Sequence, residues 1–245
     1  MEQIVFLLRE HFFPSGCALC GKNLSGAKEC WYGLCENCAE ALKKDGPEGG
    51  GACGRCDCCG RPLVSERGRC MECRNGEAPC FDRIVTLYPY RGICRKLLGA
   101  WKFGKNLAVG HFLAESVGET LARIPEFRPG EGGPVLVPVP PRPGKIRSTG
   151  WDQVEHLTRL LEKKEGPSLP VSRCLRRLPA MTQKKLDRER RRQNLRGKIV
   201  IRAGVPETAI LLDDVITTGS TMDACAAALK AGGARKVLGI CLFYS

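Results

Sequence analysis

Residues 209–221 read AILLDDVITTGST, and this stretch decides the fold of the chain. Its apolar residues, Ile210 to Leu212 with Val215 beyond the two acids, are typical of a strand buried on both faces of a parallel sheet. The Thr, Gly and Ser residues that follow predict a tight loop. The Ala-rich segment from about Met222 to Ala231 predicts a helix. The sequence therefore predicts a strand, a loop and a helix in direct succession.

The loop of this unit has the features of an anion site. Its small residues let the backbone close around a phosphate, and the helix behind it directs unpaired N–H groups and the positive end of its dipole toward the loop. The two adjacent acids could accept hydrogen bonds from the vicinal hydroxyls of a sugar. A ribose 5-phosphate is thus the expected ligand, and the expected binding residues are Asp213, Asp214, Thr217, Thr218, Gly219, Ser220 and Thr221.

A simpler interpretation is a strand–turn–helix with a capping box, because Ser220 and Asp223 have capping-box spacing. A capping box would explain where the helix begins, but not why two carboxylates stand beside an anion-seeking loop. The pattern resembles the signature of the type I phosphoribosyltransferases, which bind phosphoribosyl pyrophosphate (PRPP). It differs from the Walker A motif, since no Gly-Lys-Ser/Thr follows. We therefore favour the PRPP-site interpretation.

The chain of 245 residues has 39 Lys and Arg against 26 Asp and Glu, a formal net charge of +13. Such an excess favours anionic partners such as phosphates or nucleic acid. No secretory signal and no stretch of membrane-spanning length is visible, so we expect a soluble, cytoplasmic protein. Near the N-terminus, Ile4, Leu7, Leu8 and Phe12 fall on one helical face and predict a short packing helix.

Thirteen of the sixteen cysteines lie between Cys17 and Cys94. Because intracellular thiols stay reduced, paired cysteines indicate a metal site rather than a disulfide framework. A two-residue gap lets one tight turn direct two thiolates at a single ion, and two such turns complete a tetrahedral zinc site. The four Cys-x-x-Cys pairs are Cys17/Cys20, Cys35/Cys38, Cys56/Cys59 and Cys70/Cys73.

Gly21 and Gly60 directly follow the first and third pairs, where a zinc knuckle often needs a left-handed residue. These two pairs therefore each open a knuckle that the next pair completes. We predict two zinc ribbons, Cys17–Cys38 and Cys56–Cys73, each around a structural zinc with no open position for water. A single zinc shared by the middle two pairs is the alternative. This module spans residues 1–78 and holds few apolar residues, so we expect it to need metal to fold.

From residue 79 onward the sequence is ordinary globular sequence, and we treat residues 79–245 as a second domain. Strands and helices are expected to alternate, which predicts an α/β fold with a parallel sheet and helices on both faces. The expected strands are Asp82–Tyr90, Val135–Val139, Ile199–Arg202, Ile210–Leu212 and Lys236–Phe243, and the expected helices are Ile93–Trp101, Leu107–Ala122, Trp151–Lys164 and Met222–Ala231. Ligands of such folds lie at the carboxyl ends of the strands.

Two basic segments could contribute to the same site. Residues 140–150, PPRPGKIRSTG, carry Arg142, Lys145 and Arg147, which could meet the pyrophosphate of PRPP; a solvated loop explains them equally well. Residues 173–198 contain a dense run of Lys and Arg that includes Arg188. We interpret this run as a phosphate-binding flap or a nucleic-acid strip, with a solvated helix face as the plainer alternative.

The order of these pieces resembles the ComF family, the competence-linked group of phosphoribosyltransferase-like proteins. The resemblance covers nearly the whole chain and is carried by FFPSGCALCG, the paired zinc knuckles, FDRIVTLYPYRGICRKLLGAWKFGK, the VPVP turn, Gln183 to Asn194 and ILLDDVITTGST. Zinc ribbons placed before the phosphoribosyltransferase-like part single out this family. One departure is that Thr149 stands where the family usually has the arginine of Arg-Gly-Phe-Asn-Gln, and Arg147 is the candidate substitute.

The resemblance implies a type I phosphoribosyltransferase-like fold in which Asp213 and Asp214 hold the ribose hydroxyls and residues 217–221 wrap the 5-phosphate. It implies Mg²⁺ bound with PRPP, and a role in natural transformation alongside other competence proteins, after single-stranded DNA enters the cell. Trp101 and Phe103 lie between basic residues and suit strand binding, although helix-spaced aromatic residues are usually core residues.

The expected function is therefore that of a ComF-like, PRPP-binding protein of DNA uptake, with phosphoribosyl transfer as its expected reaction. The alternative is an active nucleobase phosphoribosyltransferase of the purine-salvage type, which the zinc module disfavours. Catalysis would rest on positioning and on stabilising the leaving group by Mg²⁺ and cations. No side chain stands out as a general base, and no nucleobase pocket is visible in the sequence.

Overall fold

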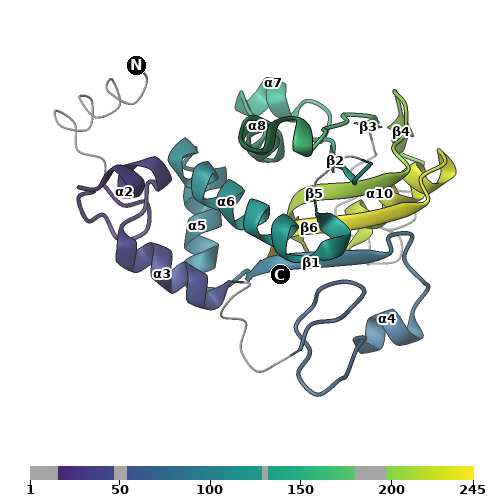
Figure 1. Cartoon of the computed structure of the whole chain (residues 1–245), viewed down its shortest axis with the longest axis horizontal. Coiled ribbons are helices and arrows are strands. Elements are labelled where there is room, and N and C mark those ends of the chain that lie inside the picture. The colour runs from purple at the N-terminus through teal and green to yellow at the C-terminus, as the bar shows by residue number, and fades with distance from the viewer. Residues whose placement is uncertain (1–15, 47–53, 129–131, 180–196) are drawn as a thin grey trace.

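The computed structural model describes residues 16–46, 54–128, 132–179 and 197–245 (Figure 1). Its centre is a sheet whose strands, in spatial order, are β1 (Arg83–Pro89), β6 (Lys236–Tyr244), β5 (Thr208–Ile216) and β2 (Val135–Pro138). All neighbouring strands of this sheet run parallel. The parallel α/β sheet predicted from the sequence is therefore confirmed.

Helices cover both faces of this sheet (Figure 1). On one face lie α5 (Gly92–Lys102), α6 (Leu107–Arg123) and α8 (Gln153–Glu165), and on the other lies α10 (Ser220–Ala231). Successive side chains of β5 pack against alternate helix layers. Ile210 and Leu212 pack beneath α5, α6 and α8, whereas Ala209 and Leu211 pack beneath α10. Successive side chains of a strand point to opposite faces, so β5 must be apolar at every one of these positions.

Two short strands lie outside the central sheet. β3 (Leu175–Arg177) and β4 (Ile199–Ile201) pair with each other in antiparallel orientation. The predicted strand Ile199–Arg202 therefore exists, but the expectation that it joins the parallel sheet is wrong. Its partner β3 escaped prediction because three residues that include two arginines give no strand pattern.

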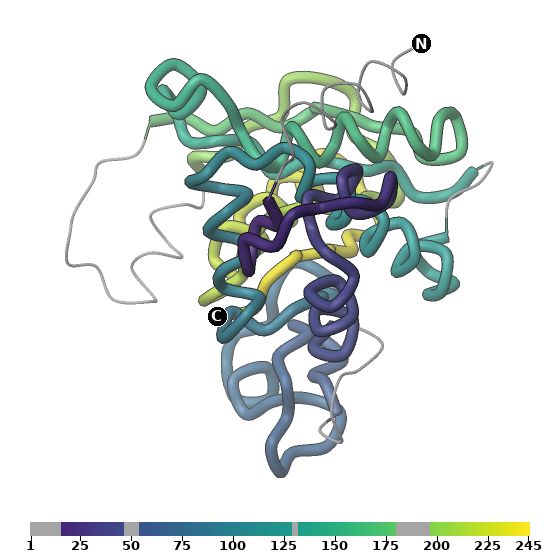
Figure 2. Tube along the Cα trace, turned by 90° about the vertical axis from the view of Figure 1, so that its left-hand side faces the viewer, coloured from purple at the N-terminus to yellow at the C-terminus, as the bar shows by residue number. Residues whose placement is uncertain are grey.

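The cysteine-rich part contributes short helices and contacts the α/β unit at two separate places (Figures 1 and 2). Its first half holds α2 (Ala27–Tyr32) and α3 (Glu36–Asp45), and its second half holds α4 (Met71–Asn75). The first half packs against α6, where the rings of Tyr32 and Phe112 meet edge to face with centroids 5.7 Å apart. The remaining short helices of the described residues are α7 (Lys145–Thr149), η1 (Pro125–Phe127) and η2 (Gly166–Ser168).

The second half of the cysteine-rich part lies along the outer side of β1. The backbone N–H of Ile84 donates to the carbonyl of Cys58 at 2.7 Å. The hydroxyl of Thr86 donates to the carbonyl of Gly60 at 2.8 Å. Arg61 binds the hydroxyl of Tyr244, at the end of the neighbouring strand β6. This half is therefore attached to the sheet through hydrogen bonds, and its buried Leu63 and cysteines also share an apolar cluster with residues of the sheet and α10.

Two expectations lie beyond these observations. The domain boundary between residues 78 and 79 stays a prediction, and the N-terminal helix expected around Ile4 to Phe12 falls outside the described residues. Within the described ranges, no helix has both the length and the apolar character needed to cross a membrane.

Candidate functional site

The two acids of the signature lie inside β5 rather than after it. The strand continues to Ile216, which still pairs with Tyr244 of β6. On its other side β2 is shorter and ends where Pro138 pairs with Leu212. The acids therefore extend beyond the end of β2, and space opens beside them in the carboxyl half of the strand.

That space is a cleft of about 490 Å³. The predicted binding residues that line it are Asp213, Asp214, Thr217 and Thr221. Among the described residues, the cationic side chains that line it are Lys102, Arg142, Lys145 and Arg177. The cleft thus combines a pair of acids with several cations, as a ligand with both hydroxyl groups and phosphates would require.

The two acids have different environments. Asp214 is buried, and its Oδ2 accepts hydrogen bonds from Lys102 Nζ at 2.5 Å and from Gln153 Nε2 at 2.6 Å. Burial opposes the charge of Asp214, but the charge of Lys102 and the hydrogen bonds from Lys102 and Gln153 together outweigh it and lower the pKa of this carboxyl. Burial and the neighbouring charge of Asp214 instead raise the pKa of Asp213 well above its ordinary value. Asp214 therefore gives up its proton at a lower pH than Asp213.

The loop after β5 turns at Gly219, whose φ of 74° is left-handed, and α10 begins at the next residue. The capping-box interpretation is wrong, because Ser220 is the first helical residue and its hydroxyl pairs with that of Thr218 at 2.8 Å. Asp223 instead accepts a hydrogen bond from the backbone N–H of Cys80 at 2.8 Å. A small hollow of about 30 Å³ lies within this loop, at the N-terminus of α10, where an anion would meet backbone N–H groups.

The predicted pyrophosphate residues separate in the structure. Residues 145–149 of the expected loop form the short helix α7. Arg142 and Lys145 line the cleft, but Lys145 Nζ is already bonded to Asp152 Oδ2 at 2.6 Å and to Gln153 Oε1 at 2.5 Å. Arg147 lies on α7 and is exposed, outside the lining of the cleft. Arg188 falls outside the described residues.

Several cleft residues were not predicted from the sequence, among them Lys102, Gln153 and Arg177. Lys102 is the last residue of α5, and nothing in the local sequence connects it to an acid more than a hundred residues later. Arg177 is the last residue of β3. Burial and the nearby charge of Arg142 lower its pKa, as expected for a cation that faces another cation. No sequence signal pointed to Arg177, because the three residues of β3 are too few to show a strand pattern.

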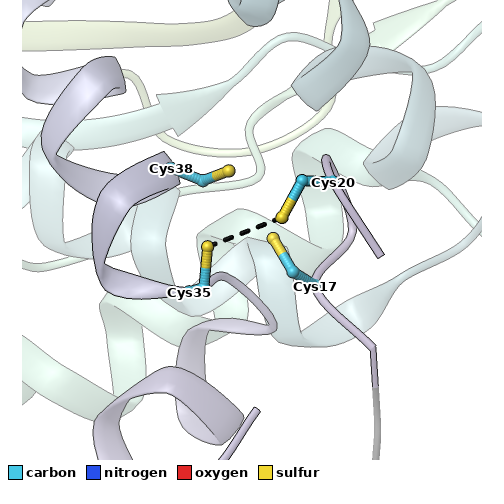
Figure 3. A group of neighbouring side chains, drawn as sticks. All are labelled: Cys17, Cys20, Cys35 and Cys38. Carbon is cyan, nitrogen blue, oxygen red and sulfur yellow. Dashed lines mark hydrogen bonds between the residues drawn. The ribbon is translucent and has the colours of Figure 1, made fainter. Parts of the chain in front are cut away.

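The predicted cysteine ligands gather into two groups of four. The first cysteine group is Cys17, Cys20, Cys35 and Cys38, and the second cysteine group is Cys56, Cys59, Cys70 and Cys73. The four sulfurs of each group lie within 4.8 Å of one another. Figure 3 shows the sulfurs of the first group directed toward a common centre. The sequential pairing is therefore the one that the structure has, and the middle two pairs belong to different groups.

The spacing of the sulfurs fits zinc. Cys20 Sγ and Cys35 Sγ are 3.6 Å apart in the first group, and Cys59 Sγ and Cys70 Sγ are 3.8 Å apart in the second. A tetrahedron with zinc–sulfur bonds of about 2.3 Å has edges of about 3.8 Å. Both cysteine groups could thus hold a structural zinc ion that leaves no position open for water.

The local backbone prepares these thiols for a metal. Gly21 and Gly60 are left-handed, with φ of 77° and 71°, as expected for knuckles. Burial raises the pKa of Cys17 and of Cys56, but hydrogen bonds from nearby backbone N–H groups outweigh it and lower each value to about 7. One such bond runs from the N–H of Cys70 to Cys56 Sγ at 3.3 Å. The first thiol of each group is therefore set up to ionise.

The fold and these groups define an α/β protein with an acid-paired cleft and two groups of four cysteines that could hold zinc. No protein-family model matches the chain. It is 26% identical over 233 residues to competence protein F of Haemophilus influenzae, covering 93% of this chain and 96% of that protein. It is also 26% identical over 243 residues to the DNA utilization protein YhgH of Escherichia coli (strain K12), covering 94% of this chain and 96% of that protein. These matches support the assignment of the chain to the ComF family.

Proposed function

We propose that the chain binds PRPP in the cleft beside β5 and acts in the uptake and use of DNA. The observation that carries the proposal is the succession of acids, loop and helix N-terminus along one wall of a cleft whose other walls carry cations. The 5-phosphate would lie in the loop of residues 217–221, the ribose beside the acid pair, and the diphosphate among the cations. Mg²⁺ would accompany the diphosphate and neutralise part of its charge.

The chemistry of such a site is positioning. Displacement at C1 of PRPP breaks the bond to the diphosphate, which leaves with the bonding electrons. Cations around the diphosphate stabilise the charge that develops on it, and the loop and the acid pair hold the sugar in place. Asp214 is already oriented by Lys102 and Gln153, so little reorganisation of this wall is needed when a ligand enters.

The DNA part of the proposal rests on the relatives, whose names are competence protein F and DNA utilization protein. The two aromatic residues that suit strand binding, Trp101 and Phe103, differ in their exposure to solvent. Trp101 is fully buried and packs against Trp151, which makes it a core residue. Phe103 is 76% exposed and stands between Lys102 and Lys105, where a base of single-stranded DNA could stack on it.

Phosphorus NMR of PRPP with Mg²⁺ and the zinc-loaded protein tests the proposal, with and without a mixture of nucleobases. Line broadening that disappears in the double variant Asp213→Asn with Asp214→Asn would support binding at this site. Pyrophosphate released only in the presence of a base would favour the alternative, an active nucleobase phosphoribosyltransferase. Unchanged PRPP signals with the folded wild-type protein would overturn the PRPP assignment.

A further inference from the structure

The hydrogen-bonding capacity of Asp214 is largely used within the protein. Its Oδ2 accepts hydrogen bonds from Lys102 Nζ and Gln153 Nε2, and its Oδ1 accepts one from the backbone N–H of Val215 at 2.9 Å. Its side chain is only 10% exposed. A carboxylate offers about four lone-pair positions, so little remains of Asp214 for a sugar. Asp213 differs, because it is partly exposed and lines the same cleft.

Lys102, unlike Asp214, still has hydrogen-bonding capacity to offer a ligand. Its side chain is 29% exposed and lines the cleft, although its ammonium is fixed to a buried acid. An ammonium has three N–H donors, and the ion pair with Asp214 occupies one of them. A free lysine side chain loses rotamer entropy when a ligand orders it, and the ion pair with Asp214 has already ordered Lys102.

The position of Lys102 is fixed from several elements at once. Gln153, at the start of α8, donates its Nε2 to Asp214 and accepts Lys145 Nζ at its Oε1. The second contact fixes which end of the amide faces Asp214. Lys145 is held in turn by Asp152. Side chains from α5, α7, α8 and β5 thus form one connected network around the ammonium.

We propose that the two acids divide the work of binding PRPP: Asp214, with Gln153, anchors Lys102 so that its ammonium contacts the diphosphate, and Asp213 alone meets the ribose hydroxyls. This inference rests on the proposed function and changes the role of one of its residues. It makes Asp214 a positioning residue and Lys102 a binding residue. Loss of the cation would leave a buried carboxylate without a partner and would strongly destabilise the folded state. The two residues must therefore act as a pair.

Isothermal titration calorimetry with three probes tests this division: PRPP with Mg²⁺, pyrophosphate with Mg²⁺, and ribose 5-phosphate. Lys102→Met should weaken binding of PRPP and pyrophosphate at least tenfold and change ribose 5-phosphate binding less than twofold. Lys102→Arg should restore much of the lost affinity, because the charge returns. Asp213→Asn should show the opposite selectivity, with ribose 5-phosphate and PRPP weakened and pyrophosphate kept. Lys236→Met is the control, since Lys236 pairs with Glu126 at the far end of β6.

The outcomes separate the two proposals. If the wild-type protein binds PRPP and Lys102→Met weakens all three probes equally, or none, the division of roles is overturned while the PRPP site stands. If the wild-type protein binds none of the probes, both proposals fall. The variant Asp214→Asn is a second test of the anchor role. It should show the same selectivity among the three probes as Lys102→Met. If it instead shows the selectivity of Asp213→Asn, the anchor role is contradicted. Circular dichroism and zinc content establish that each variant is folded.

Discussion

Asp223 Oδ1 accepts a hydrogen bond of 2.8 Å from the backbone N–H of Cys80. Asp223 lies in the first turn of α10 and is 1% exposed, whereas Cys80 follows the last thiol of the second cysteine group by seven residues. Cys59 and Cys73 of that group share a cleft of about 250 Å³ with Thr217 and Thr218. The second cysteine group and the loop proposed for the 5-phosphate are therefore neighbours.

This relationship predicts that the two cysteine groups differ in their effect on ligand binding. Cys73→Ser should weaken binding of PRPP with Mg²⁺ more than Cys38→Ser, because loss of the second group releases the segment that holds Asp223. Calorimetry of both variants at 25 °C, with zinc content measured on the same samples, checks this. Equal losses of affinity would show that the loop is independent of the second group.

The metal content itself is a separate prediction. The wild-type chain should contain two zinc ions, and Cys38→Ser and Cys73→Ser should each retain one, because the sulfurs form two separate groups of four, the number that a tetrahedral zinc site needs. Mass spectrometry of the native protein or elemental analysis provides the count. One zinc ion in the wild-type chain would contradict the assignment of both groups. A serine replacement of Cys94, which belongs to neither group, should leave the count unchanged.

The raised pKa of Asp213 predicts a pH-dependent stability. Its folded-state pKa lies above the unfolded value of about 3.9, so the folded state binds the proton more tightly. Stability should therefore fall as the pH rises from about 4 through the folded-state pKa. Asp213→Asn should remove this loss and be more stable than the wild type at pH 8. Urea denaturation at pH 5 and pH 8 measures the difference, and an identical pH dependence in both proteins would refute the prediction.

Two leucines on α6 predict how the helix contributes to the core. Leu113 is 0% exposed and Leu107 is 53% exposed. Leu113→Ala should reduce the free energy of unfolding by about 2–5 kcal/mol, since it removes buried methyl groups and leaves a cavity. Leu107→Ala on the same helix should cost less than about 1 kcal/mol. Urea denaturation of the two variants gives both values, and similar costs would mean that α6 does not pack as described.

Single-stranded DNA provides the last prediction. Phe103→Ala should weaken binding of an oligothymidine strand by roughly 1–3 kcal/mol, because a base loses its stacking surface. Fluorescence anisotropy with a labelled strand measures the change. Val64→Ala is the matched control, since Val64 is 90% exposed on the cysteine-rich part. An unchanged affinity in Phe103→Ala would remove this residue from the proposed contact with DNA.

Structural features that depend on residues close together in the sequence could be predicted. The apolar run of β5, the helix α10 and the sequential Cys-x-x-Cys pairs depend on local spacing, and the structure contains all three, although β5 extends from Thr208 to Ile216 and includes the two acids that were expected to follow Leu212. The capping box failed because Ser and Asp at that spacing also suit other partners. Asp223 instead accepts a hydrogen bond from Cys80, which lies too far away along the chain for a local pattern to predict the contact.

The contacts that define the cleft are long-range, and this is why they were missed. Lys102 and Asp214 meet because α5 and β5 pack together, and Arg177 enters the cleft only because β3 pairs with β4. A lysine at a helix end ordinarily indicates a solvated side chain. Only the packing of the elements shows which cations of so basic a chain face the cleft and which face water.

The attachment of the second cysteine group to β1 has a consequence for solubility. β1 is an edge strand, and an uncovered edge invites pairing with strands of other molecules. The carbonyl of Cys58 accepts the outward N–H of Ile84, so the knuckle of the second cysteine group shields this edge as an additional strand would. Chelation of zinc should therefore promote aggregation through β1, in addition to any loss of ligand binding.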